Sequence, residues 1–203
     1  MSDASETNET VVVTRDGTVI AKVPTGAVRV VVDAVPLHRQ GTDVPGLLVS
    51  AMEALQQQAQ SLDVALTVEA EQSLPSAHVD PEKIAWAVTT LVGNALRYAR
   101  RGSRRMPGGT IRVRVRRDGR DLLIAVEDDG PGIPDEKCAR LFERSGDPKH
   151  GSGLGLLVVH DVVAAHGGSV AVTAKCEAFT SGTTVTMRLP LDGRGSASGG
   201  PAA

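Results

Sequence analysis

The chain has 203 residues, which suffice for one domain with a modest extension but would be cramped for two full domains. Hydrophobic residues make up 41% of the sequence and aromatic residues only 2%, so aliphatic side chains must fill the core. A net charge near −2 argues against bulk attraction to nucleic acid or to an anionic membrane. Cys138 and Cys176 lie in no metal-spaced pattern, and no apolar stretch approaches the length of a membrane span. These features predict a cytoplasmic protein with free thiols.

The first 42 residues predict a β-rich extension in front of the main domain. Residues 1–10 are polar and are expected to be disordered. Apolar runs at 11–13 and 18–23 flank Asp16-Gly17, a pattern typical of a β-hairpin, and 28–32 predicts a third strand. Residues 36–44 read as a linker. The extension, 11–42, is interpreted as a small packing or partner-docking unit.

The main domain is predicted over 43–191. Apolar residues at helical spacing predict helices from Pro45 to Gln60, after Asp80-Pro81 and from Gly153 to Ala165, with a further short helix at 135–144. Predicted strands lie at 64–69, 111–115, 122–126, 170–174 and 183–189. Residues 192–203 are rich in Gly and Ser and are expected to be a disordered tail.

A strand that ends in an acidic, glycine-rich turn, 127–134, stands out within this domain. It places the Asp128 carboxylate at the rim of a sheet, beside glycine backbone that leaves room for a flat ligand. Downstream, the glycines of 151–156 open a helix whose N–H groups and dipole suit a polyphosphate, although a plain helix start fits equally well. Upstream, the Asn94 amide is either a hard oxygen ligand suited to Mg²⁺ or a solvated surface group.

Five motifs occur in a fixed order along the chain. They occupy 90–98, 128–134, 141–144, 151–156 and 182–183. Together they resemble the N, G1, F, G2 and G3 boxes of the histidine-kinase ATP-binding domain, a member of the GHKL superfamily. The resemblance implies an α+β fold, a two-layer α/β sandwich of the Bergerat type. In that fold about three helices cover a mixed sheet, and ATP with Mg²⁺ lies under a flexible lid.

The resemblance implies ATP-binding roles for residues in every motif. These residues are Asn94, Arg97, Asp128, Gly130, Gly132, Ile133, Phe142, Gly151, Gly153, Leu154, Gly155 and Thr183. By position, Asp128 would accept the adenine amino group, Asn94 would bind Mg²⁺, and the glycines of 151–155 would cradle the phosphates. Phe142 would anchor the lid, while Lys149 would stand near the γ-phosphate with no catalytic role assigned.

Two departures from the family pattern leave the reaction open. Thr90 stands where ATP-hydrolysing relatives carry a glutamate base, and threonine cannot act as a base near neutral pH. The family's phosphoacceptor histidine lies on a helical hairpin before this domain, whereas residues 1–35 are β-like and contain no histidine. His38, in the linker, lacks the acidic neighbour of that acceptor.

The leading hypothesis is a histidine-kinase-type ATP–Mg²⁺ domain that transfers the γ-phosphoryl to a histidine on a partner chain. A non-enzymatic ATP-sensing module that switches a partner surface is the first alternative. A serine kinase of the anti-sigma-factor type is the second.

Overall fold

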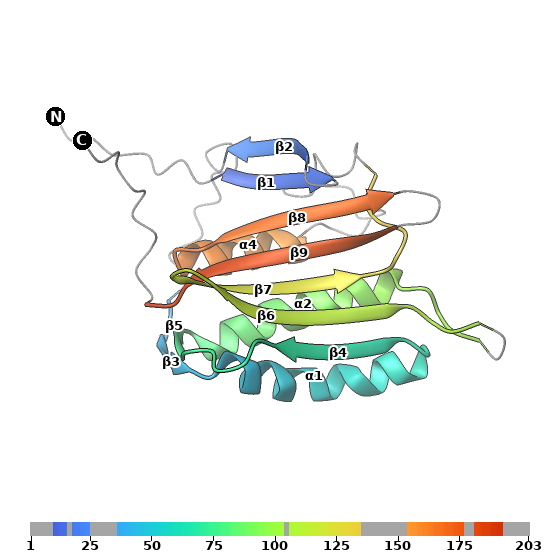
Figure 1. Cartoon of the computed structure of the whole chain (residues 1–203), viewed down its shortest axis with the longest axis horizontal. Coiled ribbons are helices and arrows are strands. Elements are labelled where there is room, and N and C mark those ends of the chain that lie inside the picture. The colour runs from blue at the N-terminus through green and yellow to red at the C-terminus, as the bar shows by residue number, and fades with distance from the viewer. Residues whose placement is uncertain are drawn as a thin grey trace.

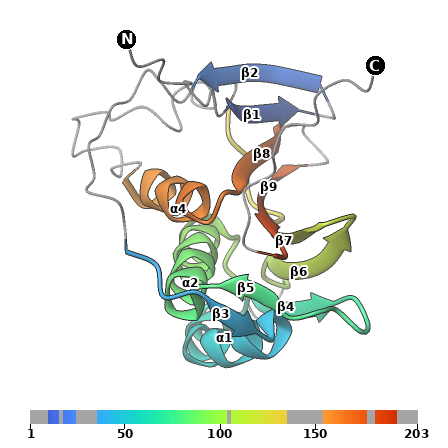
Figure 2. The ribbon, with the colours of Figure 1, turned by 90° about the vertical axis from the view of Figure 1, so that its left-hand side faces the viewer.

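In the residues that it describes, the structure, a computed structural model, has two layers, with three helices packed on one face of a mixed β-sheet (Figures 1 and 2). It describes residues 10–15, 18–24, 36–103, 106–134, 154–176 and 181–192. The helices are α1 (Val44–Ser61), α2 (Pro81–Tyr98) and α4 (Leu154–Ala165). The predicted two-layer α/β fold is confirmed. The strand predicted at 28–32 and the short helix predicted at 135–144 lie outside the described residues.

In the described part of the chain, seven strands form one sheet in the order β2-β1-β8-β9-β7-β6-β4. Its strands are β1 (Thr10–Arg15), β2 (Thr18–Pro24), β4 (Ala65–Ala70), β6 (Thr110–Asp118), β7 (Asp121–Asp128), β8 (Ser169–Cys176) and β9 (Ser181–Pro190). The pairs β4–β6 and β1–β8 are parallel, and the other neighbours are antiparallel. A separate two-stranded sheet pairs β3 (Gln40–Thr42) with β5 (Ala77–Val79).

The alternating sequence of β6 decides which face of the sheet is covered. Ile111, Val113 and Val115 are buried under the helices, whereas the arginines between them are exposed on the opposite face. Arg114 bridges Glu127 of β7 at 2.9 Å and Glu69 of β4 at 3.2 Å. The covered face therefore holds the core, and the open face is polar.

The helix α2 lies at the centre of the helical layer, between α1 and α4 (Figure 2). It begins where the sequence predicts, because Asp80 caps it by accepting the Lys83 N–H at 3.1 Å and Pro81 occupies the first turn. Its buried stripe consists of Ile84, Ala87, Val88, Leu91, Val92, Ala95 and Leu96. None of the helices in the described ranges is both long and apolar enough to cross a membrane.

The N-terminal hairpin β1–β2 forms as predicted, and it also joins the main sheet. Val12, Val13 and Thr14 of β1 run parallel to 171–173 of β8. The predicted linker also contains β3, which pairs with β5, and neither strand was predicted from the sequence. Both pairings join segments more than 30 residues apart, which local sequence patterns do not report.

We expect Ile111→Ala to lower the free energy of unfolding by about 2–5 kcal/mol, because the side chain is fully buried and a cavity would remain. Urea denaturation measures this loss. Arg112→Ala on the same strand is the matched control. Its side chain lies on the open face, so a change within about 0.5 kcal/mol is expected. Equal effects of the two substitutions would contradict the assignment of the faces.

Candidate nucleotide-binding site

The acidic turn begins at the end of β7, where Asp128 lies opposite Thr183 of β9. The Oδ1 atom of Asp128 accepts a hydrogen bond from the Gly130 N–H at 2.9 Å, which closes the turn. Burial raises the pKa of the Asp128 carboxyl above its ordinary value, and hydrogen bonds from the Gly130 and Thr183 backbone offset only part of this effect. The sheet therefore holds a partly desolvated carboxylate at its rim.

Close contacts explain why glycines flank Asp128. A Cβ atom on Gly130 would lie 2.8 Å from Asp128 Oδ1 and 3.3 Å from the carbonyl oxygen of Tyr98, the last residue of α2. A Cβ atom on Gly182 would overlap the carbonyl oxygen of Asp128. Gly132 has φ +73°, a left-handed conformation that favours glycine. The turn, the start of β9 and the end of α2 are thus packed backbone against backbone.

The neighbouring Asp129 has a structural contact instead. Its Oδ1 accepts the Thr110 N–H at 2.8 Å, and its own N–H donates to the Thr110 carbonyl at 3.3 Å. These bonds attach the turn to the first residue of β6. Asp129 is therefore engaged with β6, and a substitution of Asp129 can serve as a control for the same substitution of Asp128.

The first turn of α4 packs against α2 at the position of Asn94. A Cβ atom on Gly155 would lie 3.3 Å from Thr90 Cγ2 and 3.8 Å from Asn94 Nδ2. Asn94 is partly exposed, one helical turn before Tyr98, whose carbonyl meets the acidic turn. The last turns of α2 therefore meet the N-terminus of α4 and the acidic turn at one edge of the molecule.

The remaining predicted site residues are placed differently. Arg97 is exposed in the last turn of α2. Ile133 packs with Val172 and Ala174 of β8, so it anchors the end of the turn to the sheet. Leu154 is the first residue of α4. Phe142, Lys149, Gly151 and Gly153 lie outside the described residues.

Sequence reasoning assigned no role to Tyr98 and Gly182, although the motifs include both. The relevant contacts run through the backbone of Tyr98 and through the missing side chain of Gly182. Neither side-chain chemistry nor hydrophobic spacing reports such contacts. For Gly182 the glycine itself was a signal, whereas the sequence gives no signal for the Tyr98 carbonyl.

The helix α2, the acidic turn and α4 all lie within a region that matches a known family. The family described as histidine kinase-, DNA gyrase B-, and HSP90-like ATPase matches residues 79–193, more than half of the chain. The chain belongs to this ATPase family. It is a histidine-kinase-type ATP-binding catalytic domain, as its similarity to sensor kinases supports.

Three similar proteins illustrate the relationship. The alginate biosynthesis sensor protein KinB of Pseudomonas aeruginosa is 35% identical over 142 residues, which are 68% of this chain and 23% of KinB. The mycobacterial sensor histidine kinase MprB has a TM-score of 0.62 and 27% identity, over 76% of this chain and 98% of that structure. Full-length ShkA, solved in complex with AMPPNP, has a TM-score of 0.68 over 80% of this chain and 33% of its own.

The identity to ShkA is 24%, so that likeness supports the fold alone. The chain spans only about a quarter of the length of KinB. The family therefore establishes the ATP-binding domain alone.

We expect Asp128→Asn to weaken ATP binding by at least tenfold, or about 1.4 kcal/mol, because an amide replaces the charged acceptor. Isothermal titration calorimetry measures the affinity. Asp129→Asn is the matched control, because an amide oxygen still accepts the Thr110 N–H. Equal affinity of the two variants would contradict the assignment of Asp128.

The same substitution should not lower stability at neutral pH. A carboxyl whose folded-state pKa is raised binds its proton more tightly in the folded than in the unfolded chain. Its ionisation therefore costs stability as pH rises from the unfolded value of 3.8 through the folded value. Asp128→Asn removes this cost, so its free energy of unfolding at pH 7 should equal or exceed that of the wild type.

Proposed function

We propose that the chain binds ATP with Mg²⁺ at the edge where the acidic turn, α2 and α4 meet, and that it donates the γ-phosphoryl to a histidine on a partner chain. The observation that carries this proposal is that the Asp128 turn and Gly155 of α4 both meet the last turns of α2, which carry Asn94. These residues come from three separate motifs. The Asp128 carboxylate suits the adenine ring, the Asn94 amide suits a metal ion, and the backbone at Gly155 suits the phosphate groups.

The adenine end of the site follows from Asp128. A carboxylate has about four acceptor positions, and two backbone N–H groups use only part of this capacity. The exocyclic amino group of adenine donates hydrogen bonds and suits the remaining positions. Guanine presents a carbonyl oxygen at the equivalent position, which the negative charge would repel. The site should therefore select ATP over GTP.

The phosphate end follows from α4 and Asn94. The first N–H groups of α4 lack partners within the helix and favour an anion. In the described part of the chain no group of three or more His, Cys, Asp or Glu side chains could hold a metal ion by itself. A single amide oxygen suits Mg²⁺, which keeps its waters and shares oxygens with nucleotide phosphates. When bound, Mg²⁺ would neutralise phosphate charge.

The transfer itself rests on positioning. The γ-phosphoryl group must be held in line with an imidazole nitrogen of the acceptor. Thr90 lies beside Gly155, and its hydroxyl cannot deprotonate water near neutral pH, which favours transfer over hydrolysis. His166 is unsuited as an acceptor, because it is only 1% exposed and both of its ring nitrogens accept or donate hydrogen bonds.

The position of Thr90 also supports a second candidate function. A domain that binds ATP–Mg²⁺ and lacks a base there can hold the nucleotide without turnover. Such a domain would act as an ATP sensor whose partner affinity depends on the nucleotide.

The metal assignment is tested by Asn94→Ala. We expect this change to remove the gain in ATP affinity that Mg²⁺ produces, and to leave the affinity measured in EDTA unchanged, because only the metal ligand is lost. Gly93→Ala is the control. Its added methyl group meets nothing within 4 Å, so binding should persist. A loss in EDTA as large as the loss in Mg²⁺ would contradict a metal-binding role.

The reaction is tested with γ-labelled ATP, Mg²⁺ and purified helical-hairpin proteins that carry a phosphoacceptor histidine. We expect an acid-labile, alkali-stable phosphoryl group on a partner, and no label with Asn94→Ala. Tight ATP binding without labelled partners would contradict transfer and support the sensor. Acid-stable phosphoserine on a partner would instead indicate a serine kinase of the anti-sigma-factor type.

A further inference from the structure

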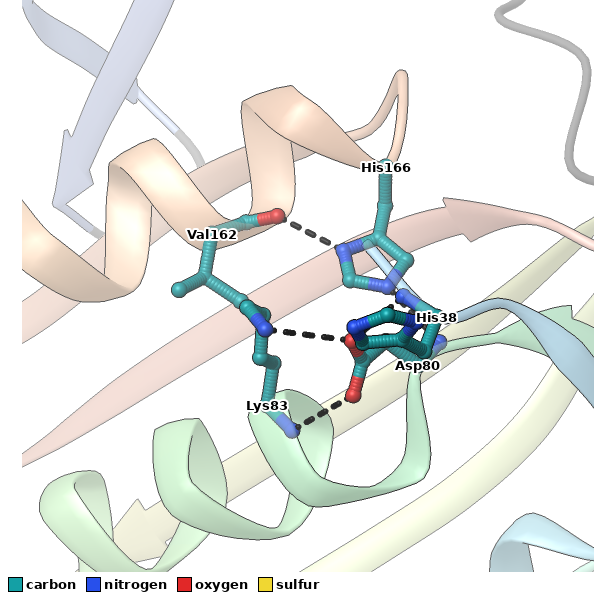
Figure 3. Close-up of polar contacts among 5 residues, drawn as sticks. All are labelled: His38, Asp80, Lys83, Val162 and His166. Atoms are coloured by element: carbon teal, nitrogen blue, oxygen red, sulfur yellow. Dashed lines mark hydrogen bonds and ion pairs between the residues drawn. The ribbon is translucent and has the colours of Figure 1, made fainter. Parts of the chain in front are cut away.

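A polar joint connects the linker before β3 to the two helices of the nucleotide site. Figure 3 shows His38 of the linker, Asp80 and Lys83 at the start of α2, and His166 just after α4. The joint lies at the opposite ends of these helices from Asn94 and Gly155. We define it as the residues His38, Arg39, Asp80, Lys83 and His166.

His166 links the two helices directly. Its Nδ1–H donates to the Val162 carbonyl at 2.7 Å, and its Nε2 accepts the Asp80 N–H at 3.0 Å. These partners require the neutral ring with the proton on Nδ1, since a carbonyl only accepts and an amide only donates. Burial lowers the pKa of His166, and the charges of Arg39 and Lys83 act in the same direction.

Asp80 links α2 to the linker. Its carboxylate is nearly fully buried, and Oδ2 accepts the His38 N–H at 2.8 Å and the Lys83 ammonium at 3.2 Å. Burial by itself raises the pKa of Asp80, but these bonds and the Lys83 N–H together hold it below its ordinary value. The carboxylate is therefore ionised and committed to these partners at neutral pH.

Arg39 links the linker to α4. Its Nη2 donates to the Ala165 carbonyl, the last residue of the helix, at 2.6 Å. A cation at a helix C-terminus interacts favourably with the helix dipole as well as with the orphan carbonyl. The linker thus contacts both helices through adjacent residues, by the His38 backbone and the Arg39 side chain.

The contacts at the two ends show that α2 and α4 run antiparallel. Asp80 meets His166 at one end, and Asn94 meets Gly155 at the other. Hydrogen bonds weaken steeply with distance and angle, so a shift of one helix along the other would break the bonds of the joint. The same shift would separate Asn94 from the first turn of α4.

We propose that this joint is a latch through which the linker and the nucleotide site regulate each other. The latched linker holds α2 and α4 in the arrangement that binds ATP–Mg²⁺, and bound nucleotide keeps the linker latched. Arg39, Asp80 and His166 are positioning residues, remote from the nucleotide. The proposal rests on the nucleotide site proposed above. Its physical basis is the α2–α4 pair, because the linker contacts at one end and the nucleotide site at the other both favour the same arrangement of the two helices.

By thermodynamic linkage, the linker contacts change nucleotide affinity as much as bound nucleotide stabilises the linker contacts, so the proposal can be measured in two ways. The His38 N–H exchanges with solvent only when its bond to Asp80 opens. Hydrogen exchange of peptides that cover 36–43 therefore reports the latch, and calorimetry reports ATP–Mg²⁺ affinity. We expect ATP–Mg²⁺ to slow this exchange in the wild type.

Arg39→Ala is the principal variant, because Arg39 is partly exposed and its loss removes the contact to α4. We expect faster linker exchange without nucleotide and ATP–Mg²⁺ affinity reduced by about fivefold, the lower end of typical coupling. Arg39→Lys keeps a charge and a donor and should recover part of both effects. Arg114→Ala is the matched control, since it removes two ion pairs on the open face of the sheet.

The outcomes separate the latch from the proposed function. If the wild type binds ATP–Mg²⁺ but Arg39→Ala has the same affinity, or if nucleotide does not slow linker exchange, the latch is overturned and the binding site stands. If the wild type does not bind ATP–Mg²⁺, the proposed function fails and the coupling with it. Equal loss of affinity in Arg114→Ala would also overturn the latch, because general destabilisation would then explain both variants.

Discussion

The packing of α2 onto β6 and β7 of the sheet is the constraint on which the rest of the structure depends. Its apolar stripe covers the buried faces of β6 and β7, and its flanks contact α1 and α4. Burial of this stripe supplies the main driving force that holds the helix in place. Because the helix body is fixed, both of its ends are available for polar contacts with defined geometry.

The two ends of α2 carry different chemistry. At the C-terminal end, the Tyr98 carbonyl abuts the acidic turn, and Asn94 faces the first turn of α4. At the N-terminal end, Asp80 caps the helix and also binds His38 and, through its N–H, His166. One helix therefore connects the linker to the candidate nucleotide site over its whole length. Because α2 is held in place, a shift of α4 along it would change the contacts at both ends together.

Glycine has a specific structural role in this site. At Gly130 and Gly182 the backbone of one element approaches another so closely that a Cβ atom does not fit. This close approach keeps Asp128 at the rim of the sheet, partly desolvated, with its pKa raised. A partly desolvated carboxylate lowers the stability of the fold, and groups that do so are often found at binding sites.

The sequence by itself determined the local elements and the order of the motifs. The alternation in β6, the Asp80-Pro81 cap and the apolar runs of β1 and β2 are local patterns, and they correctly predicted a strand, a helix start and an antiparallel strand pair. The glycine-rich motifs indicated the family for the same reason. Only the tertiary structure decided that β1 lies beside β8, that β3 pairs with β5, and that His166 is bonded to Asp80. Those contacts join segments far apart in the chain, and they form only because the docked helices and sheet bring compatible donors and acceptors within hydrogen-bonding distance.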